Sequence, residues 1–83
     1  MSITKRIVAN CFNVPTNKVE QIDSKQLFIV HRTTGTILVS YRTKVGYLQG
    51  NTWYLTKERY SVTTTKQLNS FAKSRTVVWV DIV

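Results

Sequence analysis

The sequence contains a single cysteine, Cys11, and a single histidine, His31, among its 83 residues. One thiol and one imidazole exclude an intrachain disulfide, a Cys/His zinc site and an iron–sulfur cluster held by this chain alone. No apolar run approaches the roughly 18 residues of a membrane-spanning helix. Residues 1–12 also lack the continuous apolar stretch and cleavage site of a secretory signal. We therefore expect no disulfide framework, no Cys/His metal site, no membrane-spanning helix and no secretory signal in this sequence.

Acidic residues are also scarce, since four of them stand against twelve Lys and Arg and give a net charge of +8. Between residues 24 and 80 there are nine bases and one acid, Glu58. A field of one sign attracts polyanions and speeds their encounter with the protein. The same charge lies at the top of the roughly 2–8 charges that keep a small domain soluble. We favour an acidic partner, and solubility alone stays the alternative.

Apolar residues make up 42% of the chain, which is typical of one small folded domain over residues 1–83. Apolar spacings of three and four predict a helix over residues 3–12, with Cys11 on its buried stripe. Thr64, followed three residues later by Gln67, forms a capping-box pattern that predicts a second helix over residues 65–73. Apolar runs bounded by turn residues predict strands at 18–22, 26–31, 37–42, 45–49, 52–55 and 76–82.

This order of elements predicts an α+β fold. We expect a mainly antiparallel sheet of four to six strands, with the N-terminal helix and the helix near 65–73 packed on it. Gly50 and Asn51 lie between two β-rich runs and predict a two-residue hairpin turn.

The sequence offers no catalytic site. Its four acids are scattered and its three glycines are isolated, so neither a carboxylate pair nor a phosphate-binding loop is indicated. His31 ends an apolar strand without a nucleophile or an orienting acid in view. Cys11 is interpreted as a small core residue. We therefore expect no enzyme activity, no metal and no cofactor.

Aromatic and basic residues alternate in the second half of the chain, as they do on sheets that bind single-stranded nucleic acid by stacking. Strand parity places Trp53 beside Leu55 and Tyr41 among aliphatic residues, so we expect both rings in the core. Tyr54 and Tyr60 are expected at the surface as stacking platforms. The alternative, that all these rings fill a small core, stays open, and no RRM or KH signature is present.

Basic residues follow the first and third strands of the predicted meander over residues 37–55. Because the chain direction reverses twice, these two strands end at the same end of the sheet. We expect an anion-binding surface there, or alternatively a set of solvated loop cations. The cations concerned are Arg42, Lys44, Lys57, Arg59 and Lys66.

Four aliphatic hydroxyls precede the predicted second helix: Ser61, Thr63, Thr64 and Thr65. They are interpreted as caps of the helix amides. A second interpretation is an anion site at the helix N-terminus. A third is purely architectural, with the Tyr41 hydroxyl bonded to these hydroxyls and joining strand to helix.

The segments Ser40-Tyr41-Arg42-Thr43-Lys44-Val45 and Tyr60-Ser61-Val62-Thr63-Thr64 resemble a pattern in small bacteriophage and prophage proteins. The resemblance covers roughly residues 38–71. It implies a phage origin and the cytoplasm of a host cell, which suits a single reduced cysteine. It implies no activity and no catalytic residues. The family pattern often has His where this chain has Gln67, so no role for that side chain carries over.

Charge, aromatics and resemblance together predict a small, basic, non-catalytic phage-type module that binds nucleic acid or a nucleoprotein. The alternative is a phage-encoded inhibitor that contacts a host protein such as a defence nuclease or a polymerase. A membrane surface fits less well, because no expected helix combines a basic face with Trp or Phe anchors. A free sheet edge would also allow a homodimer.

Overall fold

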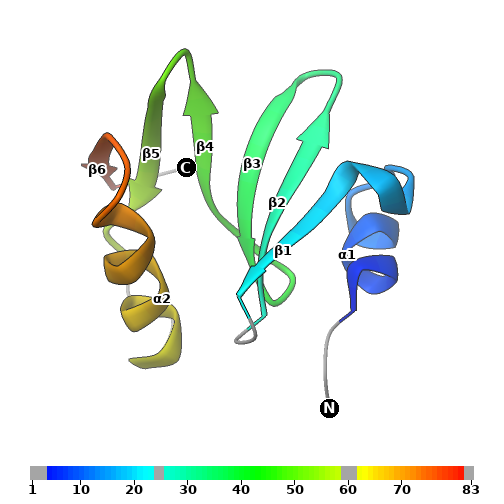
Figure 1. Ribbon diagram of the computed structural model, residues 1–83, viewed down its shortest axis with the longest axis horizontal. Coiled ribbons are helices and arrows are strands. Elements are labelled where there is room, and N and C mark those ends of the chain that lie inside the picture. Colours follow the sequence, from blue (N-terminus) through cyan, green and yellow to red (C-terminus); the bar gives the residue numbers. More distant parts are fainter. Residues whose placement is uncertain (1–3, 24–25, 59–61, 82–83) are drawn as a thin grey trace.

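The computed structural model describes residues 4–23, 26–58 and 62–81. These residues contain two α-helices, one 3-10 helix and six strands, and the predicted α+β fold is confirmed (Figure 1). In chain order the elements are α1 (Lys5–Cys11), η1 (Thr16–Lys18), β1 (Val19–Asp23), β2 (Leu27–Arg32), β3 (Gly35–Ser40), β4 (Thr43–Gln49), β5 (Thr52–Thr56), α2 (Val62–Ala72) and β6 (Val77–Val80).

The described strands form one sheet whose spatial order follows the chain from β1 to β6. Neighbours from β1 to β5 are antiparallel, and β5 and β6 are parallel. Parallel neighbours need a long crossover connection, which the segment containing α2 provides. The prediction of a mainly antiparallel sheet is therefore confirmed, and the one parallel pair explains why the second helix precedes the last strand.

Helix α1 packs on one face of the sheet, called here the α1 face. Val8 and Ala9 are buried against Phe28, Val30 and other residues of β1 to β3. The side chain of Thr4 caps the helix by accepting a hydrogen bond from the Ile7 amide at 3.3 Å. A seven-residue helix is too short to be stable alone in water, so its packing on the sheet fixes it.

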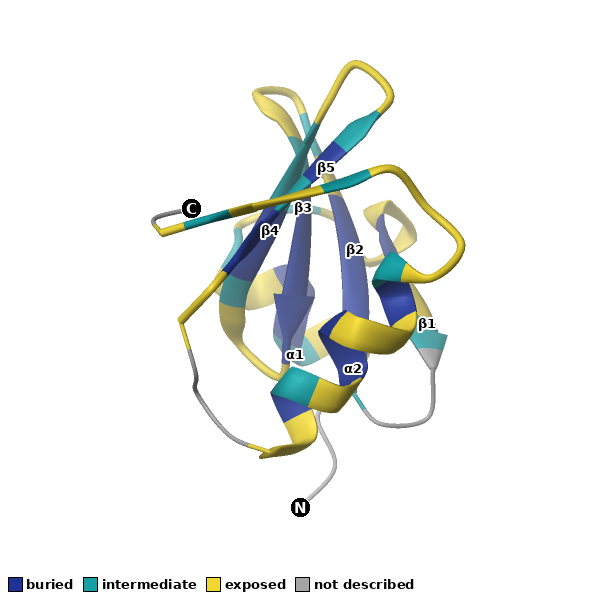
Figure 2. Cartoon of the chain, turned by 90° about the vertical axis from the view of Figure 1, so that its left-hand side faces the viewer, coloured by how far each residue is buried: buried dark blue, intermediate teal, exposed yellow. Residues whose placement is uncertain are grey.

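Helix α2 contributes to the core on the opposite face, called here the α2 face. Leu68 and Phe71 are buried with Leu55 and Trp53 in a second core cluster. The rings of Trp53 and Phe71 meet edge to face, with centroids 5.1 Å apart and planes at 83°, a favoured aromatic geometry. The expectation that Trp53 lies in the core is confirmed. Figure 2 shows the buried central strands between the two helices and the largely exposed β6.

Two residues that the sequence placed in the core are exposed. Cys11 is exposed, because α1 ends there and the chain turns at Asn13, so that Phe12 and Val14 pack against the core instead. Tyr41 is 39% exposed. Strand β3 ends one residue before it, and Tyr41 lies in the turn to β4 with a φ of 59°. Strand parity does not extend into that turn.

The capping role predicted for Thr64 is wrong. Helix α2 begins at Val62, so Thr63, Thr64 and Thr65 lie inside the helix; Ser61 lies outside the described residues. Thr64 is buried and its hydroxyl lies 3.1 Å from that of Ser40. The link between strand and helix therefore exists, but Ser40 rather than Tyr41 provides it from the strand side.

Candidate polyanion-binding face

A β-bulge in β4 brings a cation and an aromatic ring to the same face of the sheet. Lys44 and Tyr47 are three positions apart, so in a regular strand they would point to opposite faces. The register between β3 and β4 shifts at Leu38 and Val39, which leaves Val45 as an extra residue in β4. Lys44 and Tyr47 consequently share the α1 face, with the Lys44 Nζ 5.6 Å from the Tyr47 ring centroid.

The hairpin of β4 and β5 adds a second ring beside the first. Its two-residue turn at Gly50 and Asn51 sets the register that pairs Tyr47 with Tyr54. The two rings are stacked, with centroids 5.1 Å apart and planes 13° from parallel. Both side chains are half-buried. The outward orientation predicted for Tyr54 is therefore found, in a stack that the sequence analysis did not anticipate.

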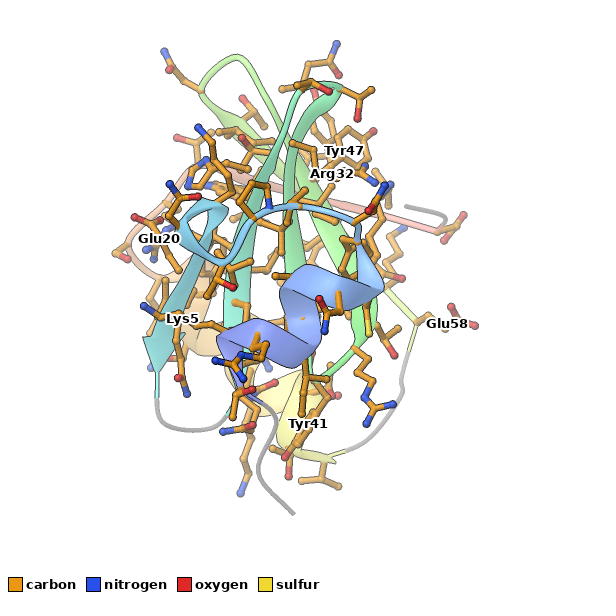
Figure 3. All side chains as sticks on the ribbon, turned by 90° about the vertical axis from the view of Figure 1, so that its right-hand side faces the viewer. Lys5, Glu20, Arg32, Tyr41, Tyr47 and Glu58 are labelled. Atoms are coloured by element: carbon orange, nitrogen blue, oxygen red, sulfur yellow. The ribbon has the colours of Figure 1, made fainter. Side chains whose placement is uncertain are left out.

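Arg32 ends β2 on the same face. It follows Val30 by two positions, and Val30 belongs to the core of the α1 face. Its partner on β3 is Gly35, whose missing side chain leaves room above that strand. Seen from the side of α1, Arg32 and Tyr47 both lie above the helix, beyond the part of the sheet that it covers (Figure 3). The Arg32 Nε is buried and has no hydrogen-bond partner within the described part of the chain.

We call this part of the α1 face the open face. Helix α1 contacts mainly β1 and β2, so neither of the described α-helices covers β4, β5 and β6 on that side. The side chains that define the open face are Arg32, Lys44, Tyr47, Tyr54 and Val78. It combines two cations, a tyrosine stack and an apolar residue that is 44% exposed.

The acids whose side chains are described lie away from the open face. Glu20 lies 3.3 Å from the His31 Nε2, and His31 alternates with Ile29, a core residue of the α2 face. Asp81 pairs with Lys57 at 3.8 Å. Lys57 and Glu58 line a shallow pocket with residues of α2. Among the described side chains, positive charge is therefore least compensated on the side that carries the tyrosine stack.

Of the five cations predicted to converge, those that the structure describes do not all lie on one face of the sheet. Strands β3 and β5 end at the same end of the sheet (Figure 1), which brings Arg42, Lys44 and Lys57 to that end. Lys44 lies on the α1 face, whereas Lys57 borders α2 and Lys66 is exposed on α2 itself. Arg59 and Tyr60 lie outside the described residues. One compact site made of all five cations is therefore not what the structure shows.

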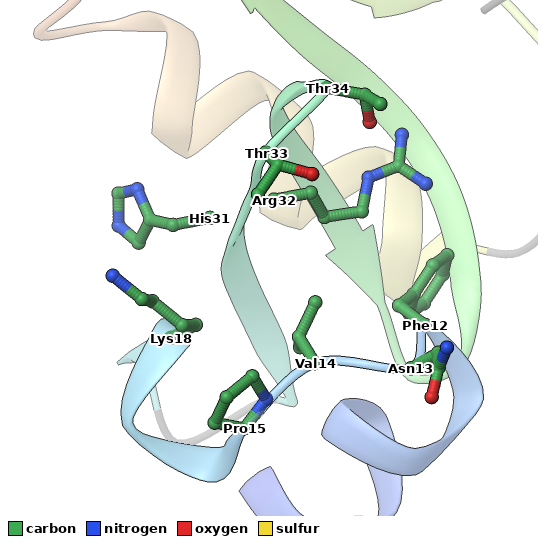
Figure 4. A pocket seen from close by; sticks show the side chains of 9 residues that line it. All are labelled: Phe12, Asn13, Val14, Pro15, Lys18, His31, Arg32, Thr33 and Thr34. Carbon is green, nitrogen blue, oxygen red and sulfur yellow. The ribbon is translucent and has the colours of Figure 1, made fainter.

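A cleft of about 570 Å³ lies between the end of α1 and the β2–β3 turn. Its basic lining residues are Lys18, His31 and Arg32. Figure 4 shows that Arg32 extends to one side of the hairpin and that Lys18 and His31 lie on the other. Two cations and an imidazole that diverge do not form one anion site, so we assign Arg32 to the open face and no ligand to the cleft.

Sequence reasoning missed Tyr47 and Arg32. The signal for Tyr47 was present, because a two-residue turn at Gly50 and Asn51 pairs residue 47 with residue 54 by counting outward. Arg32 lies one residue beyond the strand predicted over residues 26–31, in what the sequence indicates is a hairpin loop. Extending the alternation from Phe28 and Val30 by one step would have placed it on their face.

None of the helices among the described residues is long and apolar enough to cross a membrane. Within those same residues, no three potential metal-ligating side chains lie together. No curated protein and no solved structure is detectably similar to the chain. Residues 13–78, which run from the end of α1 into β6, match a family of unknown function, DUF8033. The match covers most of the sequence, and the chain belongs to the DUF8033 family.

Proposed function

We propose that the chain is a non-catalytic module that binds nucleic acid, free or in a nucleoprotein, through the open face. The observation that carries the proposal is the tyrosine stack next to Lys44 and on the same face as Arg32, on the side of the sheet from which the described acids are absent. Cations alone would attract any polyanion. Aromatic rings beside them favour nucleic acid, because bases stack on such rings.

The cytoplasm of a host cell and a phage origin are part of the same proposal. Both follow from the resemblance of residues 38–71 to small phage proteins and suit the single cysteine. A basic protein in the cytoplasm meets nucleic acid as the most abundant polyanion, so this setting fits the proposed ligand.

Binding to DNA or RNA is expected to weaken linearly on a log–log plot as salt concentration rises. The reason is counterion release, and the slope reports how many phosphates the cations neutralise. We expect the double substitution Arg32→Ala and Lys44→Ala to reduce affinity at least about tenfold, or roughly 1.4 kcal/mol, and to flatten that slope. Fluorescence anisotropy with labelled DNA and RNA at several salt concentrations measures both quantities.

A matched control removes two charges from exposed residues outside the open face, as in Lys66→Ala with Lys73→Ala. Exposed substitutions usually change stability by less than about 0.5 kcal/mol each, so the control should fold, and circular dichroism checks the fold of both variants. Equal losses in the two variants would show that only net charge matters and would reject the open face as the site. Absence of binding to any nucleic acid at low salt would reject the function itself.

The second candidate function is inhibition of a host protein, and the edge of β6 favours it. Val78 and Trp79 are 44% and 38% exposed, and the strand Val77–Val80 carries no charged side chain. Edge strands without charges are templates for pairing with another chain. The same edge is the place where the predicted homodimer would form.

A protein partner at this edge is expected to be lost with Trp79→Glu, because a charge there opposes an apolar contact and strand pairing. The experiment is affinity capture from nuclease-treated bacterial lysate with the wild type and with this variant, and sedimentation analysis of the pure chain tests the homodimer. Capture of the same proteins by both forms would exclude the β6 edge as the contact surface.

A further inference from the structure

We infer that the open face binds single-stranded rather than double-stranded nucleic acid, with an unpaired base stacked on Tyr54. This inference rests on the proposed function and specifies its ligand. In this arrangement Arg32 and Lys44 contact phosphates of the nucleic-acid backbone, on the side of the stacked base where β2 and β4 lie.

Tyr54 has one ring face that Tyr47 does not cover. Its neighbours across the sheet are Tyr47 on β4 and Val78 on β6. Tyr47 covers one face of the ring at a centroid distance of 5.1 Å. The other ring face is turned toward β6, where the side chain is the short and exposed Val78. A base placed above Val78 would extend the existing stack by one ring.

Only a base that has left a duplex can occupy this position. In double-stranded nucleic acid both faces of each base are covered by neighbouring pairs, and proteins reach only the base edges in the grooves. Exposed aromatic rings on a sheet bind bases that are already unstacked. The open face has no described helix standing out from it that could enter a groove, since α1 lies flat against β1 and β2.

The positions of Arg32 and Lys44 allow both side chains to contact backbone phosphates of a nucleic-acid strand whose base stacks on Tyr54. Arg32 on β2 and Val78 on β6 are separated by four strand spacings, about 19 Å at roughly 4.8 Å each. Lys44 lies on the intervening strand β4 near the Tyr47 ring, and the register places it on the opposite side of the Tyr47–Tyr54 row from Arg32. A phosphate at the Arg32 guanidinium would accept charge-assisted hydrogen bonds from its terminal nitrogens.

The test compares a labelled oligothymidylate with a hairpin duplex in fluorescence anisotropy at one low salt concentration. We expect the wild type to bind the single strand at least about tenfold more tightly than the duplex. Tyr54→Ala should lose about tenfold in single-strand affinity, within the range measured for removal of a stacking ring. Its duplex affinity should not change. Tyr54→Phe keeps the ring and should bind the single strand as the wild type does.

Tyr54→Leu preserves an apolar side chain against Tyr47 and replaces the Ala variant if that variant does not fold. Single-strand affinity equal to wild type in folded Tyr54→Leu would overturn the inference. So would equal affinity of the wild type for single strand and duplex. In both cases, salt-dependent binding and the loss of affinity on substitution of Arg32 and Lys44 would still support the proposed function. Absence of binding to either probe would overturn both.

Discussion

Gly46→Val is expected to destabilise the fold by about 3 kcal/mol, the upper end of the usual cost of overpacking a core. A Cβ at position 46 would lie 2.5 Å from the Leu55 Cδ2 and 2.9 Å from the backbone oxygen of Tyr54. The leucine end can move, but the oxygen belongs to the β5 backbone and is fixed by strand pairing. The substitution therefore forces β4 and β5 apart where they carry the tyrosine stack.

Urea unfolding followed by Trp fluorescence measures this loss, with Thr43→Val as the control. Thr43 is exposed on the same strand, so a β-branched residue there should change stability by less than about 0.5 kcal/mol. The stability loss of Gly46→Ala should lie between those of Gly46→Val and Thr43→Val. If Gly46→Val unfolds at the same urea concentration as the wild type, the close approach of β4 to β5 is wrong. A folded Gly46→Val should also bind nucleic acid less well, since the Tyr54 backbone shifts.

The β-bulge at Val45, next to Gly46, marks the limit of what the sequence alone predicts about the sheet. Strand existence follows from local apolar patterns, and the turn at Gly50 and Asn51 follows from residue type, so both could be predicted. The bulge at Val45 depends on which residues of β3 lie opposite, a non-local matter that one sequence does not reveal. The bulge decides that Lys44 and Tyr47 share a face, so the candidate site could not be assembled from parity alone.

The candidate site was also only partly predictable, because it depends on non-local packing as well as on local sequence patterns. Tyr54 was expected at the surface from its position between Trp53 and Leu55, and it lies there half-buried. The cations were expected to gather at one end of the sheet, which strand direction does determine. The face on which a cation lies depends on where α2 packs, since Lys57 borders α2 and Lys66 belongs to it. No local sequence pattern determines that packing.

Helix α2 is tied to the sheet by a buried hydrogen-bonded cluster of Ser40, Thr64 and Gln67, all nearly inaccessible to solvent. The Ser40 hydroxyl donates to the Gln67 Oε1 at 2.7 Å. Because a serine hydroxyl has only one hydrogen, Thr64 must be the donor in its 3.1 Å contact with the Ser40 Oγ. The chain of donors thus runs from Thr64 through Ser40 to Gln67, and Gln67 is its final acceptor.

Gln67→Leu is expected to cost about 1–3 kcal/mol, because it leaves a buried hydroxyl hydrogen without its acceptor. Asn69→Leu is the matched control, since it makes an amide-to-leucine change at an exposed position of the same helix. Ser40→Ala with Gln67→Leu removes donor and acceptor together, so the double variant should lose less than the two single losses added. The measurement is a double-mutant cycle in urea, and strictly additive losses would contradict the cluster. Because Ser40 precedes the turn that leads into β4, this cluster ties α2 to the end of β3 that adjoins Lys44.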